Sequence, residues 1–232
     1  IPEAAGAVHL ATCYTTRAES PEDISRTNID FPLSVLQALI NQGKRFFINA
    51  DTFYPKTRDE YGRTKAEFRE MASALAAQSD LQFINARLEH VYGPSDSEHK
   101  FIPSIIRLLL ENAAEIKLTT GSQLRDFVHV SDVAGAFSLL ARGACAGSLA
   151  ASSFQIGTGQ QRSIRDLVET LREMTSSKTK LLWGAVPTLP GEIMASSADI
   201  RPLAELGWTP QVTLESGLKR LVEEIRQNLH YS

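Results

Sequence analysis

The sequence of residues 45–86 is RFFINADTFYPKTRDEYGRTKAEFREMASALAAQSDLQFINA, and its apolar pattern decides the fold. The apolar run at 45–49 predicts a buried strand, the Ala-rich stretch at 60–78 predicts a long helix, and 81–86 predicts another buried strand. A strand, a helix and a strand in that order form the βαβ unit of a parallel sheet. The stretch therefore predicts an α/β fold.

The same alternation extends to both sides of this unit. Gly43 follows a helical pattern as a C-cap residue does, and Ser163 with Asp166 forms an acidic capping box at the start of another helix. Further strands are predicted at 7–11, 126–130, 154–157 and 180–183. Further helices are predicted at 28–42, at 102–112, from a cap at 131–132 to residue 142, and from residue 163 onward. Two short helices are predicted at the end of the chain.

Composition limits the class of protein. The chain has 232 residues, 43% hydrophobic and 22% charged, which is ordinary for a globular protein. Its net charge of −3 argues against nucleic-acid binding, and no apolar run is long enough to cross a membrane. The two cysteines, Cys13 and Cys145, are typical of a reducing compartment, with one disulfide as the alternative. We therefore predict a soluble, cytoplasmic protein, and we expect no metal site because no residue cluster has metal-ligand spacing.

Tyr61 and Lys65 are the strongest candidates for catalysis. They are four residues apart on the predicted helix, so their side chains share one face. A free tyrosine has a pKa of about 10, but an ammonium ~4 Å away stabilises the phenolate by roughly 4 kcal/mol, or about three pKa units. We therefore predict that Lys65 lowers the pKa of Tyr61, which acts as a general acid/base. The alternative is a chance pair, because single residues of these types often occur at this spacing.

The ten residues RDFVHVSDVA at 125–134 form the most specific motif in the chain. They match, almost residue for residue, the RDFxHVxDVA stretch of the extended short-chain dehydrogenase/reductases, the NAD-dependent epimerase/dehydratase family, which the chain as a whole resembles. The other matching segments, in order, are HLAT at 9–12, Asn28, Tyr61 with Lys65, Arg87 with VYGP at 91–94, FQIGTG at 154–159 and LGWTP at 206–210.

A finer resemblance is to one branch of this family, the nucleotide-diphosphosugar 4-ketoreductases. The branch has a short connection between its serine/threonine strand and the catalytic tyrosine, as between 49–52 and Tyr61 here. The segments EHVYGP at 89–94, KFIP at 100–103 and EIM at 192–194 are also similar to it.

The resemblance implies a fold, a cofactor and a substrate. The fold is a Rossmann-like parallel sheet, in residues 1–93 and 121–157, with a smaller C-terminal α/β domain that binds the nucleotide sugar, in residues 94–120 and 158–232. The cofactor is NAD or NADP, and the partner is a nucleotide-diphosphate sugar. The implied catalytic residues are Tyr61, Lys65 and Thr52. The implied cofactor-binding residues are Ala11, Thr12, Asn28, Lys65, Leu88 and Val91. The implied substrate-binding residues are Asp51, His90, Phe101, Arg125 and Glu192.

Several of these residues have simpler alternatives. Thr52 is equally a β-branched residue at a strand end, and His90 is equally a loop residue. Arg125 is expected to pair with the substrate diphosphate through its fork of donors, and a salt bridge with Asp126 is its alternative. We expect His129 to have a structural role inside a buried strand.

The chain departs from the family pattern at three places. Ala50 occupies the position of the family's catalytic serine or threonine, and Thr52, two residues further on the same strand face, is the proposed substitute. Leu189 stands where a second phosphate-binding arginine is expected, which predicts weaker diphosphate binding. The glycine-rich turn that holds a dinucleotide pyrophosphate is missing, and the first residue is Ile1. We expect the family's first βα units to precede this residue in the physical protein.

Two functions follow from these observations. The first is an NAD(P)-dependent oxidoreductase or epimerase acting on a nucleotide-diphosphate sugar. The alternative is a non-catalytic binding or regulatory member of the same fold, and the retention of both Tyr61 and Lys65 speaks against it. A homodimer is also expected, because relatives pair through the helix of Tyr61, and Ala72, Ala76 and Ala77 there permit close helix contact.

Overall fold

The structure is a computed structural model, and it describes residues 4–14, 19–189 and 191–230. The chain forms two compact units. The first comprises residues 1–88, 135–156 and 199–208, and the second comprises 89–134, 157–198 and 209–232.

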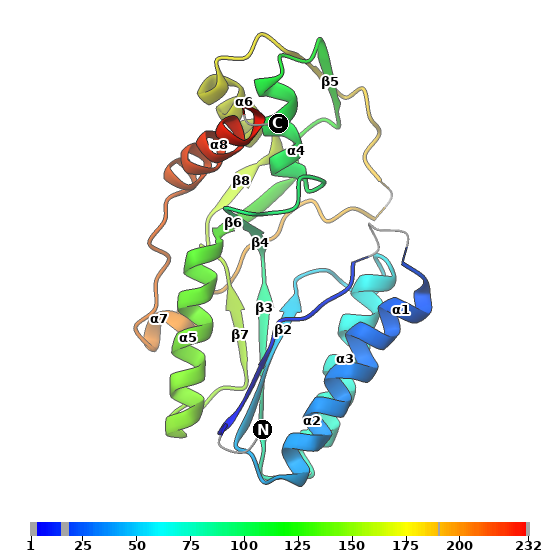
Figure 1. The fold of residues 1–232 in the computed structure, drawn as a ribbon, viewed down its shortest axis with the longest axis vertical. Helices are drawn as coiled ribbons and strands as arrows, with labels where there is room; N and C mark the ends of the chain where they lie inside the picture. The colour runs from blue at the N-terminus through cyan, green and yellow to red at the C-terminus, as the bar shows by residue number, and fades with distance from the viewer. Residues whose placement is uncertain (1–3, 15–18, 190, 231–232) are drawn as a thin grey trace. The chain divides into compact units, whose positions relative to one another are not determined.

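Four parallel strands form the sheet of the first unit, in the order β1-β2-β3-β7. They are β1 (Gly6–His9), β2 (Phe46–Thr52), β3 (Gln82–Leu88) and β7 (Ser153–Ile156). Two helices, α2 (Phe31–Asn41) and α3 (Glu60–Ala76), lie side by side along one face, and α5 (Val130–Ala146) lies on the other side of the sheet (Figure 1). The predicted βαβ unit is confirmed, and its helix is α3.

Aromatic and aliphatic side chains fill the space between this sheet and its two helices. Phe47 on β2 and Phe68 on α3 have no exposed surface, and their ring centroids are 6.0 Å apart. Leu36 of α2 and Phe83 of β3 belong to the same core. The apolar run that predicted a buried strand is therefore buried because α2 and α3 cover it.

The region before α2 differs from the prediction of one helix over 28–42. A short helix, α1 (Pro21–Ser25), is capped by the Ser20 hydroxyl, which accepts a hydrogen bond from the Asp23 N–H at 3.1 Å. A π-helical turn, η1 (Arg26–Asp30), then joins it to α2. Gly43 follows α2 with a φ of +63°, so the predicted C-cap is confirmed.

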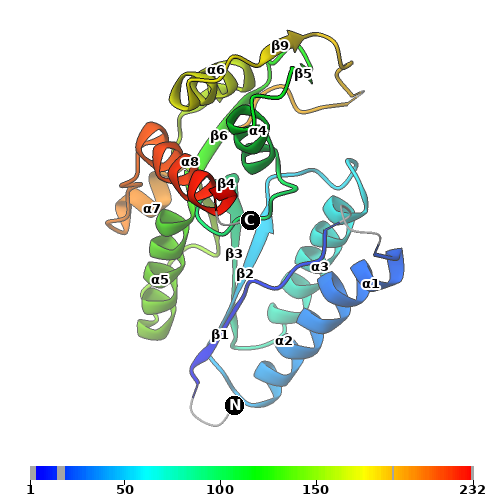
Figure 2. The ribbon, with the colours of Figure 1, turned by 45° about the horizontal axis from the view of Figure 1, so that its top comes forward.

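The second unit contains a three-stranded and a two-stranded sheet. The first consists of β4 (His90–Tyr92), β6 (Leu124–His129) and β8 (Gln161–Ser163), and the second of β5 (Glu115–Leu118) and β9 (Lys180–Trp183). Three helices, α4 (Phe101–Leu110), α6 (Ile164–Thr175) and α8 (Leu214–His230), pack against one another in this unit (Figure 2). Their apolar faces share one core with residues of β4, β5 and β6.

Sequence pattern predicted the longer elements of this region and missed the shorter ones. The cap at Ser163 is confirmed, since its hydroxyl accepts from the Asp166 N–H at 2.9 Å, and β9 has the predicted bounds. Strands β4, β5 and β8 have three or four residues each and were not predicted. The expected pair of short terminal helices was wrong, because α7 (Arg201–Glu205) is short but α8 has 17 residues. Helix α5 begins at Val130, not behind a cap at 131–132.

The division into units differs from the predicted boundaries at residues 89–93, 121–134, 157 and 199–208. Residues 121–134 belong to the second unit, because β6 pairs with β4 and β8. Residues 199–208 belong to the first unit, where α7 packs on β7 and Trp208 lies near Gly135. None of the described helices is long and apolar enough to span a membrane.

Candidate active site

Tyr61 and Lys65 lie in the first two turns of α3. The helix begins where the Asp59 side chain accepts a hydrogen bond from the Gly62 N–H at 2.8 Å. Tyr61 is 8% exposed and Lys65 is 2% exposed, so both side chains are on the buried side of the helix. Their spacing therefore places them together, as expected from two positions one turn apart.

The phenol of Tyr61 is enclosed by residues from the ends of two strands. The ring of Tyr14, from the segment that follows β1, covers it with centroids 4.9 Å apart. The hydroxyls of Thr52, at the end of β2, and of Thr12 lie close enough to the phenol to lower its pKa. The site thus brings together three segments that are far apart in the sequence.

These surroundings raise the pKa of Tyr61 above its usual value. Burial is the main cause, because it disfavours the charged phenolate, and Tyr14 adds to it. The nearby hydroxyls of Thr52 and Thr12 lower the pKa, but they do not offset the effect of burial. The net pKa of Tyr61 is thus raised, and the effect of Lys65 on it stays a prediction. Tyr61 is protonated at neutral pH, and it can donate a proton.

Lys65 donates to the sheet. Its Nζ is hydrogen-bonded to the backbone carbonyl of Ala50 on β2, at 2.6 Å. Burial lowers the pKa of Lys65 to about 8, while the charge of Asp51 raises it and that of Arg69 lowers it further. The ammonium is therefore retained at neutral pH, close to the range in which it exchanges a proton.

Thr52 is the hydroxyl that the structure places beside the phenol. It is 7% exposed, and its oxygen also accepts a hydrogen bond from the Tyr54 N–H at 3.2 Å. Ala50 offers only its carbonyl, which Lys65 uses. This geometry fits the prediction that Thr52 stands in for the missing side chain at Ala50, whereas its catalytic role stays a prediction.

The residues predicted to hold a dinucleotide follow the carboxyl ends of adjacent parallel strands. Ala11 and Thr12 follow β1, Leu88 ends β3, and the Lys65 ammonium lies against β2 between them. Ligands of parallel α/β sheets bind at this edge. An ammonium has three N–H donors, and the Ala50 carbonyl accepts one, so the remaining donors suit ribose hydroxyls. The residues present therefore fit a nicotinamide dinucleotide. Val91 belongs to β4 of the second unit.

Asn28 has a structural role beside its predicted cofactor contact. Its side chain is 1% exposed, and its Oδ1 accepts from the Cys13 N–H at 2.8 Å and from the Thr12 hydroxyl at 3.2 Å. Its Nδ2 donates to the Cys13 carbonyl at 2.9 Å and to the Thr64 hydroxyl at 3.1 Å. Because these bonds occupy both ends of the amide, Asn28 fastens the segment after β1 to α3, and its contact with a cofactor stays a prediction.

Asp51 is not placed to contact a substrate. Its side chain has no exposed surface, and its Oδ2 is 2.5 Å from Nη1 of Arg69 and accepts from Nδ2 of Asn85 at 2.9 Å. Its Oδ1 accepts from the Thr52 N–H at 2.8 Å. The predicted substrate-binding role of Asp51 is therefore not supported, because both oxygens have partners inside the first unit.

The other predicted substrate residues belong to the second unit. Arg125 on β6 is 7% exposed, donates to the Leu124 carbonyl at 2.9 Å and pairs with Glu192 at 3.2 Å. The alternative partner, Asp126, instead accepts from the loops that follow β7 and precede α7. Its four donors are the N–H and hydroxyl of Thr158, the Gly159 N–H and the Ala198 N–H. Two residues predicted to contact the substrate, Arg125 and Glu192, are thus brought together, and the alternative of an Arg125–Asp126 salt bridge is wrong.

His90, Phe101 and Leu189 complete the predicted substrate side. His90 is partly buried on β4, with its ring centroid 5.6 Å from that of Phe127. Phe101 begins α4 and is 40% exposed, and Leu189, at the position of the expected second arginine, is 71% exposed. The structural role predicted for His129 agrees with its position at the end of β6, where it is 5% exposed and hydrogen-bonded to the Ser131 hydroxyl at 2.7 Å.

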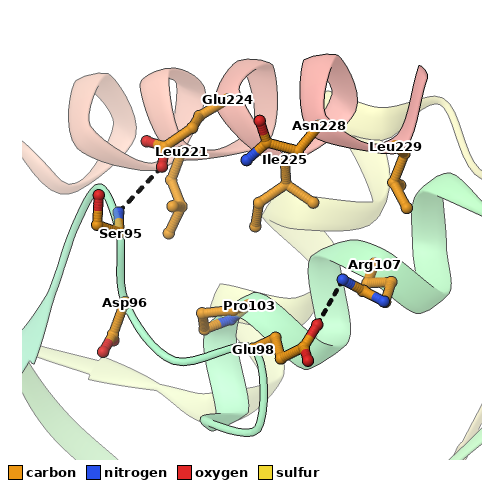
Figure 3. Close-up of a pocket in the computed structure, with 10 residues that line it drawn as sticks. All are labelled: Ser95, Asp96, Glu98, Pro103, Arg107, Leu221, Glu224, Ile225, Asn228 and Leu229. Carbon is orange, nitrogen blue, oxygen red and sulfur yellow. Dashed lines mark hydrogen bonds and ion pairs between the residues drawn. The ribbon is translucent and has the colours of Figure 1, made fainter. Parts of the chain in front are cut away.

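A shallow cavity of about 250 Å³ lies between α4 and α8 in the second unit (Figure 3). Its acidic side chains already have partners: Glu98 pairs with Arg107 at 2.6 Å, and Glu224 accepts from the Ser95 N–H at 2.9 Å. The cavity contains none of the predicted site residues. Among the described residues, no group of three or more His, Cys, Asp or Glu side chains could hold a metal ion.

The fold is of the Rossmann type, and comparison with known families agrees. The model of the NAD dependent epimerase/dehydratase family matches residues 4–157. The chain belongs to this family of NAD(P)-dependent nucleotide-sugar epimerases and reductases.

Two curated relatives show how far the similarity extends. The chain is 35% identical to CDP-abequose synthase of Salmonella typhimurium over 229 residues, which cover 95% of this chain and 76% of that protein. It is 28% identical to GDP-L-fucose synthase 1 of Arabidopsis thaliana over 254 residues, which cover 97% of this chain and 75% of that protein.

Two solved structures confirm the fold class. MoeE5 in complex with UDP-glucose and NAD superposes with a TM-score of 0.82 at 26% identity, over 97% of this chain and 80% of that one. UDP-glucose 4-epimerase of Thermotoga maritima with UDP-glucose gives a TM-score of 0.81 at 25% identity, over 97% and 78%.

Proposed function

We propose that this chain is the catalytic part of a nucleotide-diphosphosugar 4-ketoreductase, in which Tyr61 protonates the sugar oxygen. The observation behind the proposal is the buried phenol of Tyr61, which lies beside the hydroxyls of Thr12 and Thr52 with the Lys65 ammonium one helical turn away. The 35% identity to CDP-abequose synthase supports a CDP-sugar as substrate.

The protonation state of the phenol favours reduction. Reduction of a ketone needs one hydride at carbon and one proton at oxygen, and a bound nicotinamide dinucleotide supplies the hydride. Tyr61 gives its proton to the carbonyl oxygen, which becomes the new hydroxyl, and Thr52 orients that oxygen through its own hydroxyl. The raised pKa of Tyr61 leaves the phenol protonated at neutral pH, and the alkoxide that forms as the hydride arrives is basic enough to take this proton.

Lys65 and Asn28 support this step from outside the reacting atoms. Lys65 places a cation beside the expected ribose position, where its remaining donors bind hydroxyls. Asn28 holds the Thr12 side of the phenol by fixing the segment after β1. The Arg125–Glu192 pair of the second unit is the proposed diphosphate-binding element, with the guanidinium as the donor.

Turnover measurements test the proposal directly. The natively expressed protein is given CDP-, UDP-, GDP- or dTDP-linked 4-keto-6-deoxysugars with NADH or NADPH, and both cofactor oxidation and the sugar product are followed. We expect Tyr61→Phe to lose about 10²–10⁴ in kcat. Thr52→Val is expected to lose about 10²–10³, the usual effect of removing one oxyanion donor.

Tyr54→Phe is the matched control, because its ring stacks under Arg58, 3.5 Å away, and lies outside the phenol site. Equal turnover by Tyr61→Phe and Tyr54→Phe would refute the proposed role of Tyr61. A wild-type protein that binds the nucleotide sugar but oxidises no cofactor would instead support the non-catalytic alternative.

A further inference from the structure

A row of polar side chains crosses the sheet of the first unit beneath α3. Arg69 on α3 pairs with Asp51 on β2 at 2.5 Å, and Asp51 accepts from Asn85 on β3 at 2.9 Å. Asn85 in turn accepts from Nδ2 of Asn49, back on β2, at 2.9 Å. Asp51, Asn85 and Asn49 are 2%, 7% and 0% exposed. These four residues are called the polar row below.

Burying the polar row costs free energy of folding, which a purely structural role would not require. A carboxylate removed from water loses its hydration, and its ion pair repays that loss only in part, so buried ion pairs contribute little net stability. The surrounding core consists of phenylalanine and leucine, which could fill the same space. The ion pair of Asp51 and Arg69 is therefore expected to have a role that depends on its charges.

The position of Lys65 indicates that role. Its ammonium is bonded to the carbonyl of Ala50, and Ala50 lies between Asn49 and Asp51 on β2. We propose that Asp51 and Arg69 are a positioning pair for Lys65: they fix the strand segment on which the ammonium docks, and their opposed charges set its protonation. This inference rests on the proposed function, in which Lys65 acts as a cation at the active site.

The charged and titratable groups that act on Lys65 come from three elements. Asp51 on β2 favours the ammonium, and Arg69 on α3 disfavours it. His9 on β1 also interacts with Lys65, but burial lowers the pKa of His9 to about 4, so this ring is neutral at neutral pH. Burial of Lys65 itself lowers its pKa to about 8. The charge of Asp51 thus acts against burial, and Arg69 limits how far it does so.

Two substitutions should move the titration of Lys65 in opposite directions. Asp51→Asn keeps the shape of the side chain but removes the anion, so the pKa of Lys65 should fall. Arg69→Met removes the cation, leaves Asp51 with a stronger effect on Lys65, and should raise the pKa. An opposite charge within about 4–6 Å shifts a pKa by roughly 1–3 units, and a more distant charge shifts it less. Arg69 is 36% exposed and lines a groove beside α3, so methionine can replace it without a clash.

The experiment follows the titration of Lys65 by NMR in the 232-residue chain labelled at the lysine Nζ and Cε. Lys65→Arg identifies the signal, and circular dichroism checks that each variant is folded. Arg63→Met is the matched control, because Arg63 is on the same helix, pairs with Glu60 and Glu67 and is 40% exposed. We expect this control to leave the midpoint unchanged.

A fall in the midpoint for Asp51→Asn with a rise for Arg69→Met supports the proposal. A shift of both in the same direction, as general loosening of the strand would produce, overturns it, and so does a shift no larger than that of Arg63→Met. If Asp51→Asn does not fold, the result for Arg69→Met decides alone: a rise supports the pair and no rise refutes it. Because the titration needs neither substrate nor cofactor, its failure is distinguishable from a failure of the proposed reaction.

Discussion

Replacing Asn28 with alanine should loosen the active site through the segment that follows β1. The amide of Asn28 makes four hydrogen bonds, two to the backbone of Cys13 and one each to the hydroxyls of Thr12 and Thr64. Alanine removes all four at a position that is 1% exposed. Thr12 and Cys13 then lose their hydrogen bonds to Asn28.

The magnitude follows from the hydrogen bonds that are lost. The Thr64 hydroxyl keeps bonds to the carbonyls of Glu60 and Tyr61. The N–H and carbonyl of Cys13 lose their hydrogen bonds to Asn28, at a cost of roughly 1–3 kcal/mol each when buried. We expect Asn28→Ala to lower the free energy of local opening by about 3 kcal/mol in total.

Hydrogen exchange measured by mass spectrometry tests this value locally, which matters in a chain of two units whose unfolding need not be two-state. The peptides that cover residues 8–14 and 60–66 should exchange about 10² times faster, since each 1.4 kcal/mol is about tenfold. Asn41→Ala is the control, because Asn41 is exposed and accepts one hydrogen bond, from Gln37. If Asn28→Ala accelerates exchange no more than Asn41→Ala, the reasoning about stranded backbone groups is wrong.

Three further perturbations follow from the same structure. Tyr14→Ala should lower the pKa of Tyr61, because Tyr14 both covers the phenol and raises that pKa. Ultraviolet titration of tyrosinate should then show the Tyr61 transition at a lower pH, with Tyr61→Phe to identify the signal. An unchanged transition contradicts the argument. His9 has a pKa of about 4 in the folded chain and about 6.5 unfolded, so the unfolded state binds the proton first as pH falls. Stability should therefore decline between pH ~6.5 and ~4 by up to ~3 kcal/mol. Denaturant titrations of His9→Leu should show a much smaller decline in the free energy of unfolding over this pH range. A decline equal to that of the wild type would show that His9 is not its cause. Asp126→Ala removes the side-chain acceptor of the Thr158, Gly159 and Ala198 N–H groups, and Asp126 itself has no exposed surface, so it should destabilise the second unit by about 3 kcal/mol. Fluorescence of Trp183, which lies in that unit, reports the unfolding midpoint, and a shift below ~0.5 kcal/mol counts against this account.

The sequence alone determined the features that depend on neighbouring residues. The apolar runs at 45–49 and 81–86 with the helix between them specified the parallel βαβ unit, and the cap at Ser163 was visible from its spacing to Asp166. The motif at 125–134 specified the family. Each of these signals lies within a few residues or one helical turn, so no knowledge of distant contacts is needed to find it.

Only the tertiary structure decided the electrostatics of the site, because these depend on side chains that are distant in sequence. The spacing of Tyr61 and Lys65 suggested a lowered phenol pKa, but burial, with Tyr14 over the ring, raises the pKa of Tyr61. The pairing of Arg125 with Glu192 joins residues that are 67 positions apart. Asp51 and Arg69 meet because β2 passes under α3. The local sequence does not reveal whether such a contact compensates for the cost of removing its charges from water.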